Sequence, residues 1–122
     1  LTSILVGQGV SENELLAIAA VLESHSKHPL ARSIVDAAAA RGISLPQIDE
    51  VEEVVGHGII GRVEGRQRRI GKLKWLRESG ITIADDLSRR ASELQSEGQT
   101  LIGVAGDDAL IGLLAVSDSL RS

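Results

Sequence analysis

The sequence predicts an α+β domain in which helical hairpins flank a twisted antiparallel sheet of about six strands. Two tight-turn signals, Glu64-Gly65 and Gly106-Asp107-Asp108, each separate two short runs rich in Val, Ile and Leu. Runs of this kind joined by a tight turn form antiparallel strand pairs. Residues 12–24 and 29–41 instead carry Leu, Ile and Ala at helical spacing, and they follow one another closely.

The composition is that of one domain with an aliphatic core. The chain has 122 residues, which we treat as a single domain over 1–122. Hydrophobic residues make up 43%, but Phe and Tyr are absent and there is one Trp. The absence of Cys excludes disulfides and thiolate metal sites, and three His residues give little basis for a zinc site. The net charge of −4 argues against a nucleic-acid partner.

The first half of the chain predicts two helices. Ser11 and Glu14 have the spacing of a capping box, which starts a helix over residues 12–24. Pro29 suits the first position of a second helix, and Gly42 can end that helix. Because residues 24–28 form the only connection between them, we expect a helical hairpin.

The second half predicts mostly strands. Residues 58–63 and 66–70 form one expected hairpin, and residues 100–105 and 109–116 form the other. Between them, a third long helix is expected to run to Glu97, with Asp85 or Asp86 as its N-cap and Gly98 after its end. Trp75 is expected to pack a short helix onto the sheet.

Three glycines, Gly56-x-Gly58-x-x-Gly61, have the spacing of a dinucleotide-binding loop. That loop requires a helix after its last Gly, whose N-terminus faces the pyrophosphate. Here Gly61 is followed by an alternating segment that turns at Gly65, so we reject a dinucleotide site. The glycines then either mark a bulge or tight turn, or leave room for a ligand to lie against the backbone.

A second feature favours a ligand. Pro29 restricts His28 to extended conformations, and this imidazole offers a flat face in a chain with almost no other aromatic rings. Glu23, at the end of the first helix, is a carboxylate that can accept a hydrogen bond from an amino group. Each residue alone is readily explained as a capping or surface residue. Together they suit a ring with an exocyclic amine, such as adenine.

With these residues considered together, the chain resembles the nucleotide-binding domain of heavy-metal-transporting P-type ATPases. The resemblance spans essentially the whole chain and is carried by Glu23, Ser26-Lys-His-Pro-Leu-Ala31, Gly56-His-Gly58, Ile70-Gly71-Lys72, Gly98-Gln-Thr100, Gly112-Leu-Leu-Ala115 and Asp118-Ser-Leu-Arg121. It implies the fold of the P-type ATPase N-domain.

The resemblance also implies roles for individual residues. His28 would stack on adenine and Glu23 would accept from its amino group. The other wall of the site is implied to come from Gly56, Gly58, Ile59 and Gly71. Lys27 and Lys72 depart from the family, since many relatives carry Glu and Asn there, and either could change how the ribose or phosphates are held.

For the whole molecule, the resemblance implies part of an ATP-driven transporter. The catalytic Asp-Lys-Thr-Gly-Thr motif is absent, so we assign no catalytic residue and no metal site to these residues. We expect the chain to bind ATP, with Mg²⁺ on the phosphates, and to turn over little or none. Residues 1–6 and 117–122 are expected to lead into an absent phosphorylation domain, and the lack of any Met fits excision from a longer protein.

The expected partners are the phosphorylation and membrane domains of the same parent protein, on the cytoplasmic side of a membrane. The isolated fragment is expected to be a soluble monomer. Zinc, cadmium, cobalt or lead is favoured over copper as the transported metal, by general resemblance alone.

Two other functions remain as alternatives. In a standalone regulatory or interaction domain, the same His-Pro and Gly-x-Gly segments would have structural roles only. Saturable ATP binding would distinguish the predicted ATP-binding domain from this alternative. A self-sufficient hydrolase needs a nucleophile and base that we do not find.

The paired acids at 85–86 and 107–108 are explained by caps and turns. The cluster Arg66, Arg68 and Arg69 fits a solvated strand edge or a phosphate contact, and His25 and His57 fit exposed loops.

Overall fold

The domain is built on a six-stranded antiparallel sheet with strand order β1-β6-β5-β4-β3-β2. The computed structural model describes residues 3–7, 9–26 and 29–117. Its strands are β1 (Ser3–Val6), β2 (Ile48–Val54), β3 (Gly58–Val63), β4 (Arg66–Gly71), β5 (Gln99–Ala105) and β6 (Leu110–Ser117). Its helices are α1 (Glu12–Glu23), α2 (Pro29–Ala40), α3 (Leu73–Glu78) and α4 (Asp85–Ser96). The predicted α+β class and antiparallel sheet are confirmed.

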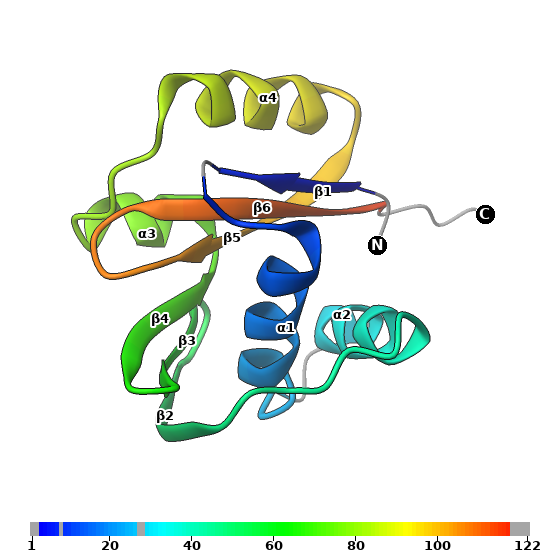
Figure 1. Cartoon of the computed structure of the whole chain (residues 1–122). Helices are drawn as coiled ribbons and strands as arrows, with labels where there is room; N and C mark the ends of the chain where they lie inside the picture. The colour runs from blue at the N-terminus through cyan, green and yellow to red at the C-terminus, as the bar shows by residue number, and fades with distance from the viewer. Residues whose placement is uncertain (1–2, 8, 27–28, 118–122) are drawn as a thin grey trace.

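Helices cover both faces of the sheet. In Figure 1, α1 and α2 lie on one side of the strands and α4 lies on the other. Two aliphatic clusters fill the layers. The first joins α1 and α2 to one face of the sheet and includes Leu16, Leu22 and Ile34, all fully buried. The second joins α3 and α4 to the opposite face around Leu76 and Leu113. Burial of such side chains is the main stabilising term for a domain of this size.

The locally encoded elements form where the sequence predicts them. The capping box at α1 is present, because the Glu14 amide donates to Ser11 Oγ at 3.1 Å and the Ser11 amide donates to Glu14 Oε1 at 3.3 Å. In the β3–β4 hairpin, Glu64 and Gly65 both have positive φ, 51° and 83°. That pair of angles is typical of a type I′ turn, whose twist matches the flanking strands.

Two details differ from the sequence predictions. The helix α4 begins at Asp85, but its N-cap is Ala84 and no side chain caps it, so the expected capping by Asp85 or Asp86 was wrong. The Asp86 carboxylate instead accepts from the adjacent Leu87 amide at 2.9 Å. The segment 1–6, expected only as an end of the domain, contains β1, which pairs with β6 and forms one edge of the sheet.

The strand pairing also fixes where a binding site can form. Gly58 in β3 lies directly opposite Gly71 in β4, at the ends of both strands. The β2–β3 turn, the segment after β4 and the first residues of β5 therefore meet near one another, because β4 also pairs with β5. The C-terminal end of α1 packs over this region of the sheet, since Leu22 would contact any side chain added at Gly61 of β3.

Candidate functional site

A pocket of about 230 Å³ lies where these segments converge. Its lining comes from the end of α1, the β2–β3 turn, the end of β4 and the start of β5. Five residues singled out from the sequence line it: Glu23, Gly56, Gly58, Ile59 and Gly71. His28, the sixth, lies outside the described residues, as does Lys27.

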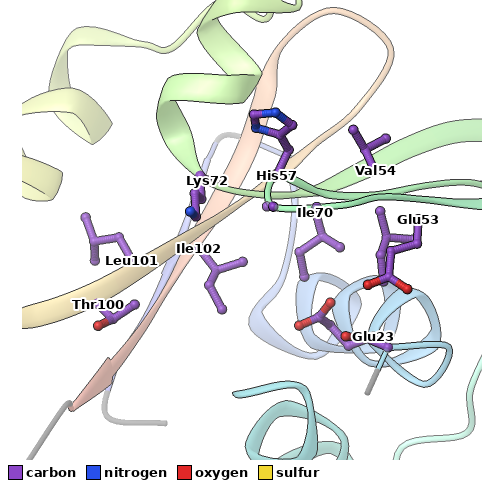
Figure 2. A pocket seen from close by; sticks show the side chains of 14 residues that line it. Glu23, Glu53, Val54, His57, Ile70, Lys72, Thr100, Leu101 and Ile102 are labelled. Atoms are coloured by element: carbon purple, nitrogen blue, oxygen red, sulfur yellow. The ribbon is translucent and has the colours of Figure 1, made fainter. Parts of the chain in front are cut away.

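The pocket has an acidic and a basic side. Figure 2 shows Glu23 and Glu53 together on one side, whereas Lys72 and His57 lie across from them. The side chains of Ile70 and Ile102 lie between these two groups. An elongated ligand with hydrogen-bond donors at one end, an apolar middle and negative charge at the other end would match this arrangement.

Glu23 is the unusual residue of this site. It is the last residue of α1 and only 9% exposed, although an isolated ionised carboxylate is costly to bury. Among the described residues it has no salt-bridge partner. Burial, and secondarily the negative charge of Glu53, raises the pKa of Glu23 from 4.5 to about 7. Burial thus favours the protonated form of the Glu23 carboxyl group. A ligand that donates a hydrogen bond to it would favour the ionised form.

Gly56 owes its identity to the turn. Its φ of 82° lies in the left-handed region that favours glycine, and no atom lies within 4 Å of where a Cβ would be. The backbone here turns from β2 into β3, with the His57 amide donating to the Val54 carbonyl at 2.9 Å. For Gly56, the tight-turn explanation is sufficient.

Gly58 and Gly71 are required by packing within the protein. A Cβ on Gly58 would clash with the Ile70 carbonyl oxygen and come within 2.7 Å of the Trp75 ring. A Cβ on Gly71 would clash with the His57 carbonyl oxygen and lie 2.9 Å from the same ring. The two glycines let the Trp75 indole lie directly against the strands. The space that their missing side chains leave is therefore occupied by Trp75, and these residues offer a ligand only their backbone.

Trp75 supports the rim of the pocket. As expected, it lies in a short helix, α3, that packs on the sheet beside the site. Its indole stacks on the His57 ring, with centroids 6.2 Å apart and planes inclined by 22°. The Arg69 guanidinium lies 5.7 Å from the indole centroid. The Lys72 amide donates to the His57 carbonyl at 3.0 Å, which ties the β2–β3 turn to the end of β4.

The sequence analysis missed part of this lining. Glu53 received no role, and His57 was interpreted only as an exposed loop residue. His57 is indeed exposed, yet it lines the pocket. Its position between two site glycines was the available signal. Thr100 and Ile102 come from β5, far along the chain, and no local pattern connects them to the glycines.

Two features were not found among the described residues. These residues contain no group of three or more His, Asp or Glu side chains arranged to hold a metal ion. Within the same residues, every helix is too short or too polar to cross a membrane.

Curated proteins similar to this chain are metal-transporting P-type ATPases. The chain is 33% identical over 120 residues to the probable copper-exporting P-type ATPase V of Mycobacterium tuberculosis (strain CDC 1551 / Oshkosh). This match covers 98% of the chain and 16% of the relative. It is 38% identical over 122 residues to a copper-exporting P-type ATPase of Legionella pneumophila, again covering 16% of that protein. The chain thus spans about a sixth of the length of these relatives. No protein-family model matches the chain.

Solved structures similar to this chain also come from metal-transporting P-type ATPases. A zinc-transporting PIB-type ATPase matches with a TM-score of 0.85 and 34% identity, over 99% of this chain and 19% of that one. The N-domain of HMA8, a copper-transporting P-type ATPase, matches with a TM-score of 0.80 and 25% identity, over 95% of this chain and 98% of that one. Copper and zinc transporters therefore share this domain fold, and the expected preference for zinc-group metals over copper stays a prediction.

Proposed function

Since the chain belongs to the N-domains of heavy-metal-transporting P-type ATPases, we propose that it binds ATP through its adenine and presents the triphosphate to a catalytic Asp. That Asp would lie in a phosphorylation domain of the same parent protein, an ATP-driven metal transporter. The domain itself would face the cytoplasm. This proposal assigns binding and orientation to the present chain, and bond breaking to residues outside it.

The observation that carries the proposal is the polarised pocket around Glu23. An adenine ring needs a narrow apolar slot with an acceptor for its amino group, and Ile59, Ile70 and Glu23, which line the pocket, would provide these. The ribose and phosphates would then extend past Lys72 towards solvent, where positive charge favours them. The backbone at Gly56 and Gly58 would form the wall against which the ring lies.

His28 completes the proposed base pocket by resemblance to the family. It would stack on the face of adenine, a contact that contributes about 1–3 kcal/mol. Because His28 follows α1 closely and directly precedes α2, it belongs to the same chain segment as Glu23. Replacing His28 therefore tests the proposed base pocket independently of the glycine turn.

Phosphoryl transfer depends mainly on orientation and charge neutralisation. In this proposal the Mg²⁺ ion is carried by the ATP phosphates. We accordingly propose that the isolated chain binds ATP with little or no turnover. A regulatory domain without nucleotide binding is the competing function, and it predicts no saturable ATP binding.

Titration of the domain with ATP and with GTP by calorimetry tests the proposal. Adenine carries an amino donor where guanine carries a carbonyl acceptor, so ionised Glu23 should favour ATP. A charge-assisted hydrogen bond is worth about 1.5–3 kcal/mol, which corresponds to at least about tenfold in affinity. The titration should be made near pH 8, where Glu23 is mostly ionised. Equal affinities for both nucleotides there would remove Glu23 from its proposed role.

Variants at His28 provide the second arm. His28→Ala should weaken ATP binding by about fivefold to more than a hundredfold. His28→Gln keeps a polar side chain but loses the aromatic face, so it should bind almost as poorly. If both variants bind ATP like the unaltered domain, the assignment of the base pocket fails.

A further inference from the structure

We propose that Glu53 is a specificity-determining residue of this pocket: its negative charge adds to the effect of burial on Glu23 and so helps to make base recognition depend on pH near neutrality. The inference rests on the proposed function, because it concerns the same nucleotide site. Glu53 would act through Glu23 and is therefore a positioning residue rather than a contact that defines the base by itself. It was not among the site residues expected from the sequence.

Strand pairing directs Glu53 towards Glu23. Glu53 lies opposite Ile59 of β3, and directly opposed residues of antiparallel strands carry their side chains on the same face. Ile59 is 2% exposed and belongs to the core under α1, so this is the face on which the end of α1 packs. Figure 2 shows the Glu53 and Glu23 side chains on the same side of the pocket.

The neighbouring Glu52 faces the other way. It lies opposite Ile60, which packs against the cluster beneath α3 and α4. Side chains of successive strand residues point to opposite faces of a sheet. Glu52 and Glu53 therefore offer a matched pair: the same side chain on the same strand, both exposed, with only one of them lining the pocket.

The charges around Glu23 leave Glu53 as the acidic neighbour. From the elements that line the pocket, the titratable groups are Glu53 on β2, His57 in the β2–β3 turn and Lys72 after β4. The start of β5 contributes the uncharged Thr100, and the segment after α1 contributes the neutral Ser26. Lys72 and His57 lie on the far side of the apolar strip formed by Ile70 and Ile102. Among the described residues that line the pocket, Glu53 is therefore the charged group on the same side as Glu23.

The pKa of Glu23 is consistent with Glu53 lying on the same side of the pocket. Burial first, and the Glu53 charge second, raise the pKa of Glu23 to about 7. Two carboxyl groups that share a pocket disfavour simultaneous ionisation. Near neutral pH, Glu23 would hence exist in both protonation states, and a change at Glu53 would shift the balance between them.

The two protonation states recognise different bases. An ionised carboxylate only accepts hydrogen bonds, so it suits the amino group of adenine. A protonated carboxyl group also donates one, so it can bind the carbonyl oxygen that guanine presents at the corresponding position. Preference for ATP over GTP should thus be strongest at alkaline pH and should decline as the pH falls through about 7.

The experiment compares the unaltered domain with Glu53→Gln and Glu52→Gln. ATP and GTP affinities would be measured by calorimetry at about pH 6 and about pH 8. The ionised fraction of a group with a pKa of about 7 changes about tenfold over this interval, so ATP binding by the unaltered domain should weaken by up to about tenfold at the lower pH. Glu52→Gln should behave in the same way. Glu53→Gln should lose part of this pH dependence and should keep a stronger preference for ATP than Glu52→Gln at about pH 6, while burial continues to raise the pKa of Glu23.

A second measurement works without nucleotide. The carboxyl carbon of Glu23, followed by NMR across the same pH range, should titrate at a lower pH in Glu53→Gln than in Glu52→Gln. Identical Glu23 titrations and identical pH profiles for both variants would overturn the inference. If no form of the domain binds ATP, the proposed function fails, while the titration of Glu23 still decides whether Glu53 affects its charge. Melting temperatures confirm that the variants are folded.

Discussion

Replacement of Glu23 by Gln should stabilise the domain at alkaline pH while weakening its proposed recognition of adenine. Gln has nearly the same shape as Glu but carries no ionisable group. Glu23 is buried to 9% exposure at the end of α1. The substitution therefore removes the cost of ionising this carboxyl group without opening a cavity in the surrounding core.

The magnitude follows from the pKa of Glu23, which rises from 4.5 to about 7 in the folded domain. Because the folded state binds this proton more tightly than the unfolded state, the stabilising contribution is complete below about pH 4.5 and is lost as the pH rises through about 7. One pKa unit corresponds to about 1.36 kcal/mol, so ionised Glu23 destabilises the folded state by about 3 kcal/mol. This term is absent in Glu23→Gln.

Urea denaturation at about pH 5 and about pH 8, followed by Trp75 fluorescence, measures the effect. The stability advantage of Glu23→Gln should grow by about 2–3 kcal/mol between the two pH values. Other carboxyl groups titrate equally in both proteins, so the difference isolates Glu23. An advantage that stays constant from pH 5 to pH 8 would refute the reasoning, because it would mean that Glu23 keeps the same charge throughout.

Three further outcomes are expected. Gly58→Ala should lower the melting temperature more than Gly56→Ala, because a Cβ at Gly58 meets backbone and Trp75, whereas Gly56 has open space and only a strained φ of 82°; the reverse order would contradict the packing role of Gly58. His57→Ala should shift the emission of Trp75, the sole Trp, since the two rings stack; an unchanged emission spectrum would argue against this stacking. Ser11→Ala should destabilise the domain by about 1 kcal/mol in urea denaturation through loss of the capping box, and no loss would show that the cap contributes nothing.

The sequence was most informative where structure is decided locally. Gly65 readily adopts the positive φ that the β3–β4 turn requires, and Ser11 with Glu14 specifies a helix start within a single turn. These features need no knowledge of the rest of the chain. The N-cap of α4 was mispredicted because the local sequence does not decide which residue takes that position. Two adjacent Asp residues are both acceptable caps, and the chain places them one step further on, inside the first turn.

The site was less predictable, because its lining is assembled by strand pairing. The spacing of Gly56 and Gly58 pointed to this region of the chain, and Glu23 was found through its position at the end of α1. Glu53 could be assigned to the pocket only after the register of β2 against β3 was known, since a shift by one residue would place Glu52 there instead. Side chains from β5 enter through a pairing that no short motif encodes.

The glycines illustrate how a structural and a binding explanation can both hold at one site. Gly58 and Gly71 are small because Trp75 lies against them, and Trp75 in turn stacks under His57 at the rim of the pocket. In a chain without Phe or Tyr, the indole is the largest rigid surface available to hold such a rim. A side chain on either glycine would displace the indole and, through it, the turn that forms the pocket wall. The Gly-x-Gly spacing would consequently support nucleotide binding by shaping the protein behind the site, rather than by leaving empty space in front of it.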